Sequence, residues 1–385
     1  MSAAITPREP NELAEALAAA TSAKQTVTLS GSGSKRRMAG PVEPSDVTVA
    51  TTGLTRLLAY EPRDLTISVE AGMPYAQLRR ILAENKQMIP LDPPFENHAT
   101  IGGILASNSS GPRRRLYGTA RDLVIGMHFA TLEGKLIQSG GMVVKNVAGL
   151  DMAKLMIGSF GTLAAMAVVN FKVIPKPAEE GTVLLSLGTL AEAITARDNV
   201  LKGVLQPSAV DLLNPVAAAQ IGRRGHLLAV QFGGNHAVVE RARKEVAAMS
   251  DAVLLDGDDE ARFWTEVRSF TQRFVEKFAD GVVVRVASTL VQLEAVLASI
   301  ETAAVARAGS GVTYAYFTRA EAAARWMSAA SRHGWKCVME FSPEAQKGTL
   351  DLWPSPGSDF AMMKRVKQMF DPDRLLNRGR LYRLI

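Results

Sequence analysis

The chain has 385 residues, 47% of them hydrophobic and 21% charged, with a formal net charge of +6. This length exceeds what one ordinary core supports, so two domains are expected. The densest basic clusters, Lys35–Arg37 and Arg113–Arg115, lie in glycine-rich stretches without interleaved aromatic residues. Because nucleic-acid binding uses aromatic stacking platforms beside basic groups, it is disfavoured. An anionic cofactor with a small carboxylate substrate fits this composition better.

The sequence shows no membrane-spanning or disulfide-bonded character. No run is long and apolar enough to cross a bilayer, and residues 1–11 lack the pattern of a secretory signal. A cytoplasmic location is therefore expected. The single cysteine, Cys337, excludes an internal disulfide and an iron–sulfur cluster held by this chain alone. We expect it to be a small buried hydrophobic residue.

Hydrophobic periodicity predicts the elements of the first 177 residues. A helix is expected over residues 11–23, opened by Asn11, with strands at 26–30, 46–51 and 65–70 and a helix after Pro74. Residues 124–132 and 135–138 are predicted to form a hairpin around Glu133-Gly134, followed by a long strand at 163–174. The stiff linker Pro175–Pro177 marks the first domain boundary.

Strands and amphipathic helices alternate beyond this linker. Strands are predicted at 182–187, 227–232, 281–288, 312–317 and 350–353, and the clearest helix begins at a Thr289/Gln292 capping box. No repeat is visible at a solenoid period. The expected fold class is α+β, with domains at 1–177 and 178–355, the second an α/β sandwich with a partly antiparallel sheet. Residues 356–385 form a C-terminal segment that begins with a basic helix.

Three segments dense in small residues carry the functional signal. The strand at 26–30 leads into Gly31-Ser32-Gly33-Ser34-Lys35, whose backbone N–H groups can converge on an anion. A plain flexible turn is the alternative. The third glycine of a Rossmann fingerprint and the Gly-Lys-Ser/Thr of a Walker loop are both absent. The second and third segments are residues 92–111 and 158–163. Together the three indicate one large ligand with phosphate and aromatic parts.

These motifs resemble the p-cresol methylhydroxylase/vanillyl-alcohol oxidase family of flavoproteins. The resemblance lies in the Gly31–Lys35 loop, in Thr100–Gly103 followed by Asn108–Gly111, in Tyr117-Gly118, and in residues 145–151 and 160–163. It covers residues 25–177, and the tail at 370–380 resembles the family's C-terminal return to the flavin. Arg378 departs from the Asn-Pro-Gly usual in the 2-hydroxy acid branch. The resemblance implies a two-part FAD-binding domain followed by a ferredoxin-like cap domain.

The resemblance also implies a set of residues that bind FAD. They are Ser30, Gly31, Ser32, Gly33, Ser34, Asp92, Thr100, Gly102, Gly103, Ser107, Asn108, Ser109, Ser110, Gly161, Thr162 and Leu163. Asn377 is expected to approach the flavin ring, and Arg380 is the best carboxylate-binding candidate, with a solvated cation near the terminus as its alternative. His98 is a weak catalytic candidate, and a loop histidine bonded to backbone is its alternative.

Departures from the family narrow the expected function. Ser34 stands where covalent members carry histidine, so FAD is expected to be bound noncovalently. The histidine-rich metal motif of the catalytic D-2-hydroxy acid subunits is absent, and none of the chain's five histidines forms a pair with ligand spacing. No metal is therefore expected. The chain looks like the flavin-binding E-type subunits of bacterial glycolate oxidase, which accompany a catalytic flavoprotein and an iron–sulfur subunit.

The resemblance thus implies a subunit of a complex that oxidises glycolate to glyoxylate, acting as an electron relay or a structural partner. The complex could attach peripherally to the inner membrane face. A stand-alone FAD oxidase of a small alcohol or sugar, and a non-catalytic assembly subunit, are the alternatives.

Overall fold

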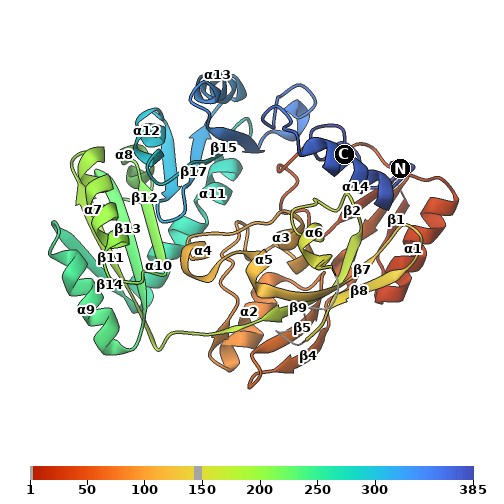
Figure 1. Ribbon diagram of the computed structural model, residues 1–385, viewed down its shortest axis with the longest axis horizontal. Helices are drawn as coiled ribbons and strands as arrows, with labels where there is room; N and C mark the ends of the chain where they lie inside the picture. The colour runs from red at the N-terminus through yellow and green to blue at the C-terminus, as the bar shows by residue number, and fades with distance from the viewer. Residues whose placement is uncertain (1–2, 143–149) are drawn as a thin grey trace. The chain divides into compact units, whose positions relative to one another are not determined.

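The computed structural model describes residues 3–142 and 150–385 and divides the chain into two compact units (Figure 1). Unit 1 comprises residues up to 110, 119–176 and 355–385, and unit 2 comprises 111–118 and 177–354. The two main boundaries differ by one residue from the expected ones. The segment 111–118, which the sequence placed in the first domain, belongs instead to unit 2. Most of the motif at 145–151 lies outside the described residues.

Unit 1 is built on two sheets that enclose a helix. A parallel sheet has the order β1 (Ala3–Ile5), β3 (Val47–Ala50), β2 (Val27–Ser30). An antiparallel sheet has the order β4 (Leu57–Glu61), β5 (Thr66–Glu70), β9 (Ala165–Lys172), β7 (Val124–Ala130), β8 (Leu136–Gly140). Helix α1 (Pro10–Ser22) packs Leu13 and Leu17 against Val49 of one sheet and Ala167 of the other. Burial of these side chains therefore joins the two sheets.

The opposite face of the five-stranded sheet packs against helices α2 (Tyr75–Glu84) and α3 (Ile101–Ala106). Strand β9 is buried on both faces, since Ala167 faces α1 while Phe171 joins the cluster that contains Leu78 and Ile104. Further short elements of this unit are η1 (Thr51–Gly53), β6 (Gln87–Met88), α5 (Ala120–Leu123), α6 (Ala153–Met156), β10 (Ile174–Pro175) and α14 (Phe360–Phe370).

Unit 2 contains an eight-stranded antiparallel sheet made of two similar halves. The strands are β11 (Glu179–Leu187), β12 (Ala209–Leu213), β13 (His226–Gly234), β14 (Ala252–Asp256), β15 (Val282–Ala287), β16 (Ala303–Arg307), β17 (Val312–Phe317) and β18 (Lys336–Phe341). The sheet order is β14-β11-β13-β12-β16-β17-β15-β18. Each half follows the β-α-β-β-α-β plan with the same internal order, and the halves join where β12 pairs with β16.

The helices of unit 2 follow the same duplication. In the first half, α7 (Leu190–Lys202) and α9 (His236–Ala247) are the crossover helices, and in the second half α12 (Leu293–Ala298) and α13 (Ala320–Ser331) take these places. All four contribute to one hydrophobic core on one face of the sheet. The remaining elements are α4 (Arg114–Tyr117), α8 (Pro215–Ala219), α10 (Gly257–Arg268), α11 (Phe270–Lys277) and η2 (Glu344–Gln346). The expected ferredoxin-like α+β domain is therefore confirmed, and it is present twice.

Several local predictions need correction. Helix α1 begins at Pro10 with Glu9 as its N-cap, because proline fits the first helical turn, so Asn11 is not the cap. The Thr289/Gln292 box forms its hydrogen bonds, but the helix proper begins at Leu293. Residues 350–353 do not form a strand, although the carbonyl of Leu352 accepts a hydrogen bond from Met339 N at 2.8 Å.

Candidate functional site

The glycine loop after β2 packs directly against the second small-residue segment. A Cβ added to Gly31 would lie 2.4 Å from Thr100 Oγ1, and Gly33 has a positive φ of +74°. Thr100 is itself fixed, because its side chain caps α3 and accepts a hydrogen bond from Gly103 N at 3.3 Å. Glycine is therefore required at residue 31 for close approach and at residue 33 for its backbone conformation. No helix follows the loop, as expected after exclusion of the Rossmann and Walker motifs.

This loop has the groups that bind an anion. Within residues 3–142 and 150–385, the backbone N–H groups from Gly31 to Lys35 donate to no acceptor. The Nζ atom of Lys35 is buried without a hydrogen bond in the same part of the chain, and burial lowers the pKa of this amine to about 7. Consecutive unpaired N–H groups with a nearby cation form a cradle for a pyrophosphate. The loop therefore fits the phosphate part of FAD.

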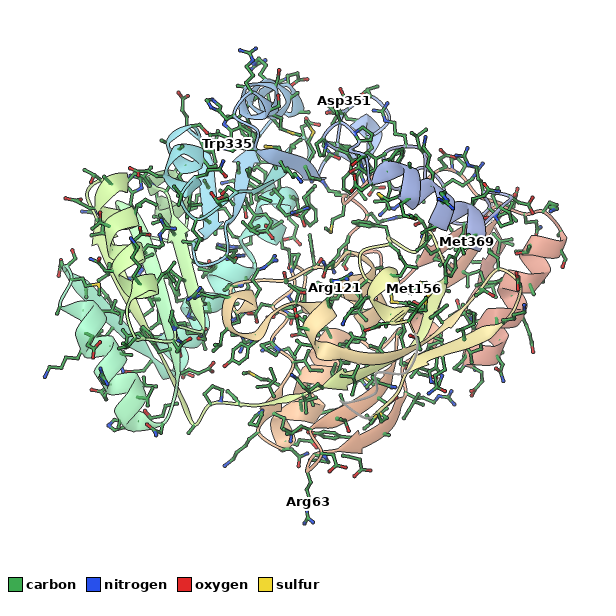
Figure 2. All side chains as sticks on the ribbon, in the orientation of Figure 1. Arg63, Arg121, Met156, Trp335, Asp351 and Met369 are labelled. Carbon is green, nitrogen blue, oxygen red and sulfur yellow. The ribbon has the colours of Figure 1, made fainter. Side chains whose placement is uncertain are left out.

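The third segment lies beside the second. Gly158 N donates to Leu105 O and Phe160 N to Ala106 O, each at 2.9 Å, so the loop at 158–163 follows the end of α3. The loop comes directly after α6, which ends at the buried Met156 (Figure 2). The structure thus brings all three small-residue segments together within unit 1.

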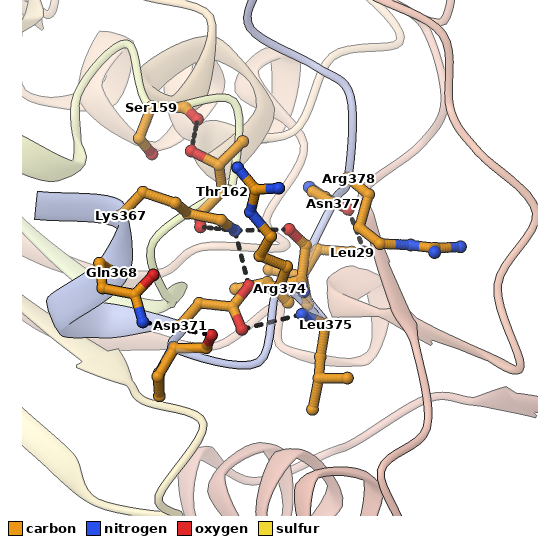
Figure 3. A network of polar contacts seen from close by, with 12 residues as sticks. Leu29, Ser159, Thr162, Lys367, Gln368, Asp371, Arg374, Leu375, Asn377 and Arg378 are labelled. Carbon is orange, nitrogen blue, oxygen red and sulfur yellow. Dashed lines mark hydrogen bonds and ion pairs between the residues drawn. The ribbon is translucent and has the colours of Figure 1, made fainter. Parts of the chain in front are cut away.

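The C-terminal tail ties these segments to one another (Figure 3). Asn377 Oδ1 accepts a hydrogen bond from Leu29 N, and its Nδ2 donates to Phe160 O, both at 2.8 Å. The backbone N of Asn377 donates to Val27 O at 2.9 Å. One residue therefore joins β2 to the third segment. Because both ends of its amide bond to the main chain, Asn377 positions the loops here.

Lys367 on α14 makes a second tie. Its buried ammonium donates to Thr162 O at 2.8 Å, to Leu376 O at 2.9 Å and to the carboxylate of Asp371 at 2.6 Å. Asp371 in turn accepts from the backbone N of Leu375 and of Leu376, each at 2.8 Å. This network holds the tail against the third segment. The sequence analysis missed Lys367, because a lysine in a basic amphipathic helix carries no signal of burial.

The expected cofactor residues differ in how they are placed. Ser107 and Ser109 hydroxyls lie 2.7 Å apart, and Ser107 also donates to Gly103 O, so this pair is engaged internally. Thr162 is 1% exposed, its hydroxyl donates to Ser159 O, and its own carbonyl accepts from Lys367, so it is engaged within the protein. The other expected residues differ in exposure. Asp92, Ser110 and Leu163 are buried, whereas Ser30, Ser34, Gly102 and Gly103 are half-buried and Ser32 and Asn108 are exposed.

The three weak catalytic candidates lie in different environments. His98 is exposed, and its backbone N donates to Phe95 O. Arg380 is buried, donates to Gly40 O at 2.8 Å and lies over the Phe160 ring at 5.7 Å. The alternative of a solvated terminal cation at Arg380 is therefore wrong, because the tail folds back onto residue 40. A Cβ added to Gly40 would lie 2.1 Å from Gly379 O, which shows how closely the tail packs there.

Comparisons with known proteins agree with this site. The model of an FAD binding domain matches residues 1–140, and that of the C-terminal domain of FAD linked oxidases matches residues 356–381. Glycolate oxidase subunit GlcE of Escherichia coli is 31% identical over 66% of this chain and 67% of that protein. Glycolate oxidase subunit GlcD of Bacillus subtilis is 27% identical over 69% of this chain and 60% of its own length.

Solved structures show the same fold at low sequence identity. A 4-ethylphenol oxidase from Gulosibacter chungangensis aligns with a TM-score of 0.74 at 12% identity, covering 98% of this chain and 88% of that one. An alkyldihydroxyacetonephosphate synthase aligns with a TM-score of 0.72 at 17% identity, covering 97% and 75%.

The chain therefore belongs to the FAD-linked oxidases of the p-cresol methylhydroxylase/vanillyl-alcohol oxidase family. Its cofactor is FAD, which the glycine loop and the adjoining small-residue segments fit, and it is an oxidoreductase that acts on CH–OH groups. In the described ranges no helix is long and apolar enough to cross a membrane.

Proposed function

We propose that this chain is the FAD-binding subunit of a complex that oxidises glycolate, or a similar 2-hydroxy acid, to the 2-oxo acid. The observation that carries the proposal is the 31% identity to glycolate oxidase subunit GlcE across two thirds of both chains. The partners are a metal-bearing catalytic flavoprotein and an iron–sulfur subunit, and the chain itself serves as electron relay or structural partner.

The placement of the candidate catalytic groups supports a relay role. Oxidation of a 2-hydroxy acid needs a base for the hydroxyl proton and cations for the carboxylate. FAD, when bound, supplies the two-electron acceptor. In unit 1, the Asn377 amide is bonded to main chain at both ends, Arg380 donates to a carbonyl, and His98 is exposed. None of these three groups is arranged as a buried base beside a cation.

Anaerobic stopped-flow mixing with glycolate tests this proposal. The purified chain is expected to hold oxidised flavin that bleaches very slowly alone and quickly once the two partner subunits are added. Rapid bleaching without partners would instead make this chain a stand-alone oxidase. A purified chain that is colourless and cannot be reconstituted with FAD would make it an assembly subunit.

The proposal includes noncovalent attachment of FAD. Ser34 occupies the loop position of the family's histidine linkage, and Cys337 is buried in β18 of unit 2, where burial raises the pKa of its thiol to about 11. Neither residue suits attack on the flavin. Acid or heat should release all the flavin into the supernatant. A fluorescent protein band after denaturing electrophoresis would contradict this expectation.

A further inference from the structure

The two outer strands of the unit 2 sheet are equivalent in the duplicated fold. β14 is the last strand of the first half and β18 is the last strand of the second. Each pairs on one side, β14 with β11 and β18 with β15. An outer strand directs part of its backbone N–H and C=O groups away from the sheet, where they can pair with another chain. The duplication therefore lets the two edges be compared directly.

The β18 edge is covered by the chain itself. Met339 N donates to Leu352 O at 2.8 Å, and Leu352 is buried. Trp353 of the same segment packs against the hydrophobic core of unit 2. A covering segment of this kind protects an edge strand from pairing with another chain.

The β14 edge has no such cover in residues 3–142 and 150–385. Apart from the ladder with β11, no hydrogen bond to the backbone of residues 252–255 is present there. The ladder itself has no register shift, and the strand sequence, Ala-Val-Leu-Leu-Asp, contains no proline or lysine. Proteins commonly use a bulge, a proline or a lysine to keep an exposed edge from pairing. β14 is thus a regular edge without these protections.

Both faces of the sheet expose an apolar side chain of β14. Val253 is 46% and Leu254 is 47% exposed, and successive residues of a strand point to opposite faces. Helix α9 covers one face through Val246 of the core, and α10 covers the other through Trp264, whose indole N–H donates to Thr182 on β11. The apolar surface that remains exposed therefore lies along the edge. An added strand would cover both side chains, whereas a helix on either face would cover one.

We propose that β14 pairs antiparallel with β14 of a second copy of this chain, so that one sheet continues through a two-fold dimer. The two-fold axis of such a pair is perpendicular to the sheet, so residues that point to the same face lie opposite each other. With the axis at Leu254, this residue lies opposite its own copy and Val253 lies opposite the partner's Leu255. Ala252 then lies opposite the partner's Asp256. An axis at Val253 or at Leu255 would instead place an aspartate opposite a leucine, so the strand is self-complementary in one register.

The charged groups beside the strand permit this register. Asp256 pairs with Arg243 at 3.2 Å, and the Arg243 side chain is 12% exposed, so this acid already has its cation. Asp251, which precedes the strand, falls opposite the partner's Gly257. No like charges therefore lie directly opposite each other, an arrangement that would be destabilising.

The same kind of contact already joins the two halves of unit 2. β12 and β16 are corresponding strands of the two halves, and they pair antiparallel, edge to edge. The dimer repeats this contact between copies, through the corresponding strand at the far edge of the first half.

Sedimentation velocity of the full FAD-loaded chain tests the pairing. Two paired strands of this length make a small interface, so we expect the dimer to dissociate at roughly micromolar concentrations. The fitted mass should rise from 41.3 kDa to twice that value between about 1 and about 100 µM chain.

Two variants of opposite charge and a matched control test the register. Leu254→Lys places two ammonium groups directly opposite each other, so it should weaken dimerisation roughly tenfold or more, and Leu254→Glu should do the same. An equimolar mixture of the two should recover the dimer, because opposite charges then face each other. Val291→Lys, at a 91% exposed residue elsewhere in unit 2, should change nothing. The four tryptophans all lie in unit 2, so their fluorescence verifies that each variant folds.

Each contrary result has a definite meaning. A wild type that stays monomeric at the highest concentration overturns the proposal, as does a dimer that persists in both charged variants. A mixture of these variants that stays monomeric overturns the register about Leu254. A monomeric chain that binds another subunit through this edge, with binding lost in Leu254→Lys, also overturns self-pairing and assigns the edge to that subunit. The measurement uses no substrate, so its result is independent of the proposed function.

Discussion

The two units position their polar groups by different means. In unit 1 the candidate cofactor loops depend on main chain: Gly31 allows close approach to Thr100, Gly33 has a positive φ, and the side chains of Lys367 and Asn377 hold the loops by hydrogen bonds. On one face of the unit 2 sheet, long charged side chains such as Arg285 and Glu340 contact each other. Loops that depend on main chain show a pattern of small residues in the sequence. Charged side chains show no such pattern, because the same residue types are common on any surface.

The largest expected effect on stability comes from breaking the buried ion pair of Lys367 and Asp371. Lys367→Met leaves Asp371 buried without its cation and two carbonyls without a donor, so we expect a loss of about 3–5 kcal/mol in stability and early release of FAD. Flavin fluorescence during a urea titration measures both the loss of stability and the release of FAD. The double variant Lys367→Met/Asp371→Asn, which removes both charges and keeps an oxygen acceptor for the backbone N–H groups, should recover part of the loss. Equal losses in the single and double variants would contradict the role of the pair.

A smaller effect is expected from filling the loop. Gly31→Val places atoms against Thr100, where a Cβ alone would lie 2.4 Å from Oγ1. Overpacking of this kind costs about 1–3 kcal/mol, so FAD should bind roughly ten- to a hundredfold more weakly while tryptophan fluorescence still reports a folded unit 2. Gly348→Val is the matched control, because nothing lies within 4 Å of a Cβ there. Unchanged FAD affinity in Gly31→Val would remove this loop from the site.

A third expected effect is a pH dependence of stability that arises from Lys35. Burial lowers its pKa from 10.5 to about 7 in the folded chain, so the unfolded chain binds more protons between these values. Stability of the FAD-free chain should therefore rise with pH above about 7, by up to about 1.4 kcal/mol per pH unit from this group. Urea unfolding at pH 7 and pH 9, compared between wild type and Lys35→Met, isolates the contribution. An identical pH response in both would show that Lys35 is solvated.

The smallest effect on stability is expected from an exposed lysine–aspartate pair. Lys24 and Asp373 also form a lysine–aspartate pair in unit 1, but their side chains are 68% and 45% exposed. Water and salt screen such pairs, so Lys24→Met should lower the Tm by no more than about 2 °C. A scan at two salt concentrations provides the check. A loss as large as that of Lys367→Met would mean that burial does not distinguish the two pairs.

The sequence by itself determined the candidate cofactor region, because glycine and small residues allow main chain to approach a ligand closely. The loop from Gly31 to Lys35, the Thr100–Gly103 segment and the Gly161–Leu163 segment were all recognisable before the structure, as was the end of β9 near Pro175. Alternation of apolar residues likewise predicted most long strands of unit 2.

The tertiary structure decided what depends on pairing between distant residues. The duplication in unit 2 appears in strand order and not in sequence, since hydrophobic cores tolerate many residue combinations on one topology. The strands β12, β14, β16 and β18 were missed because their alanine, leucine and charged residues do not distinguish a strand from a helix. Burial of Lys367 and Arg380, and the meeting of Arg285 with Glu340, follow from chain segments folding together. The sequence does not show whether a charged side chain is solvated or buried. Its surroundings in the folded chain decide its energy and its role.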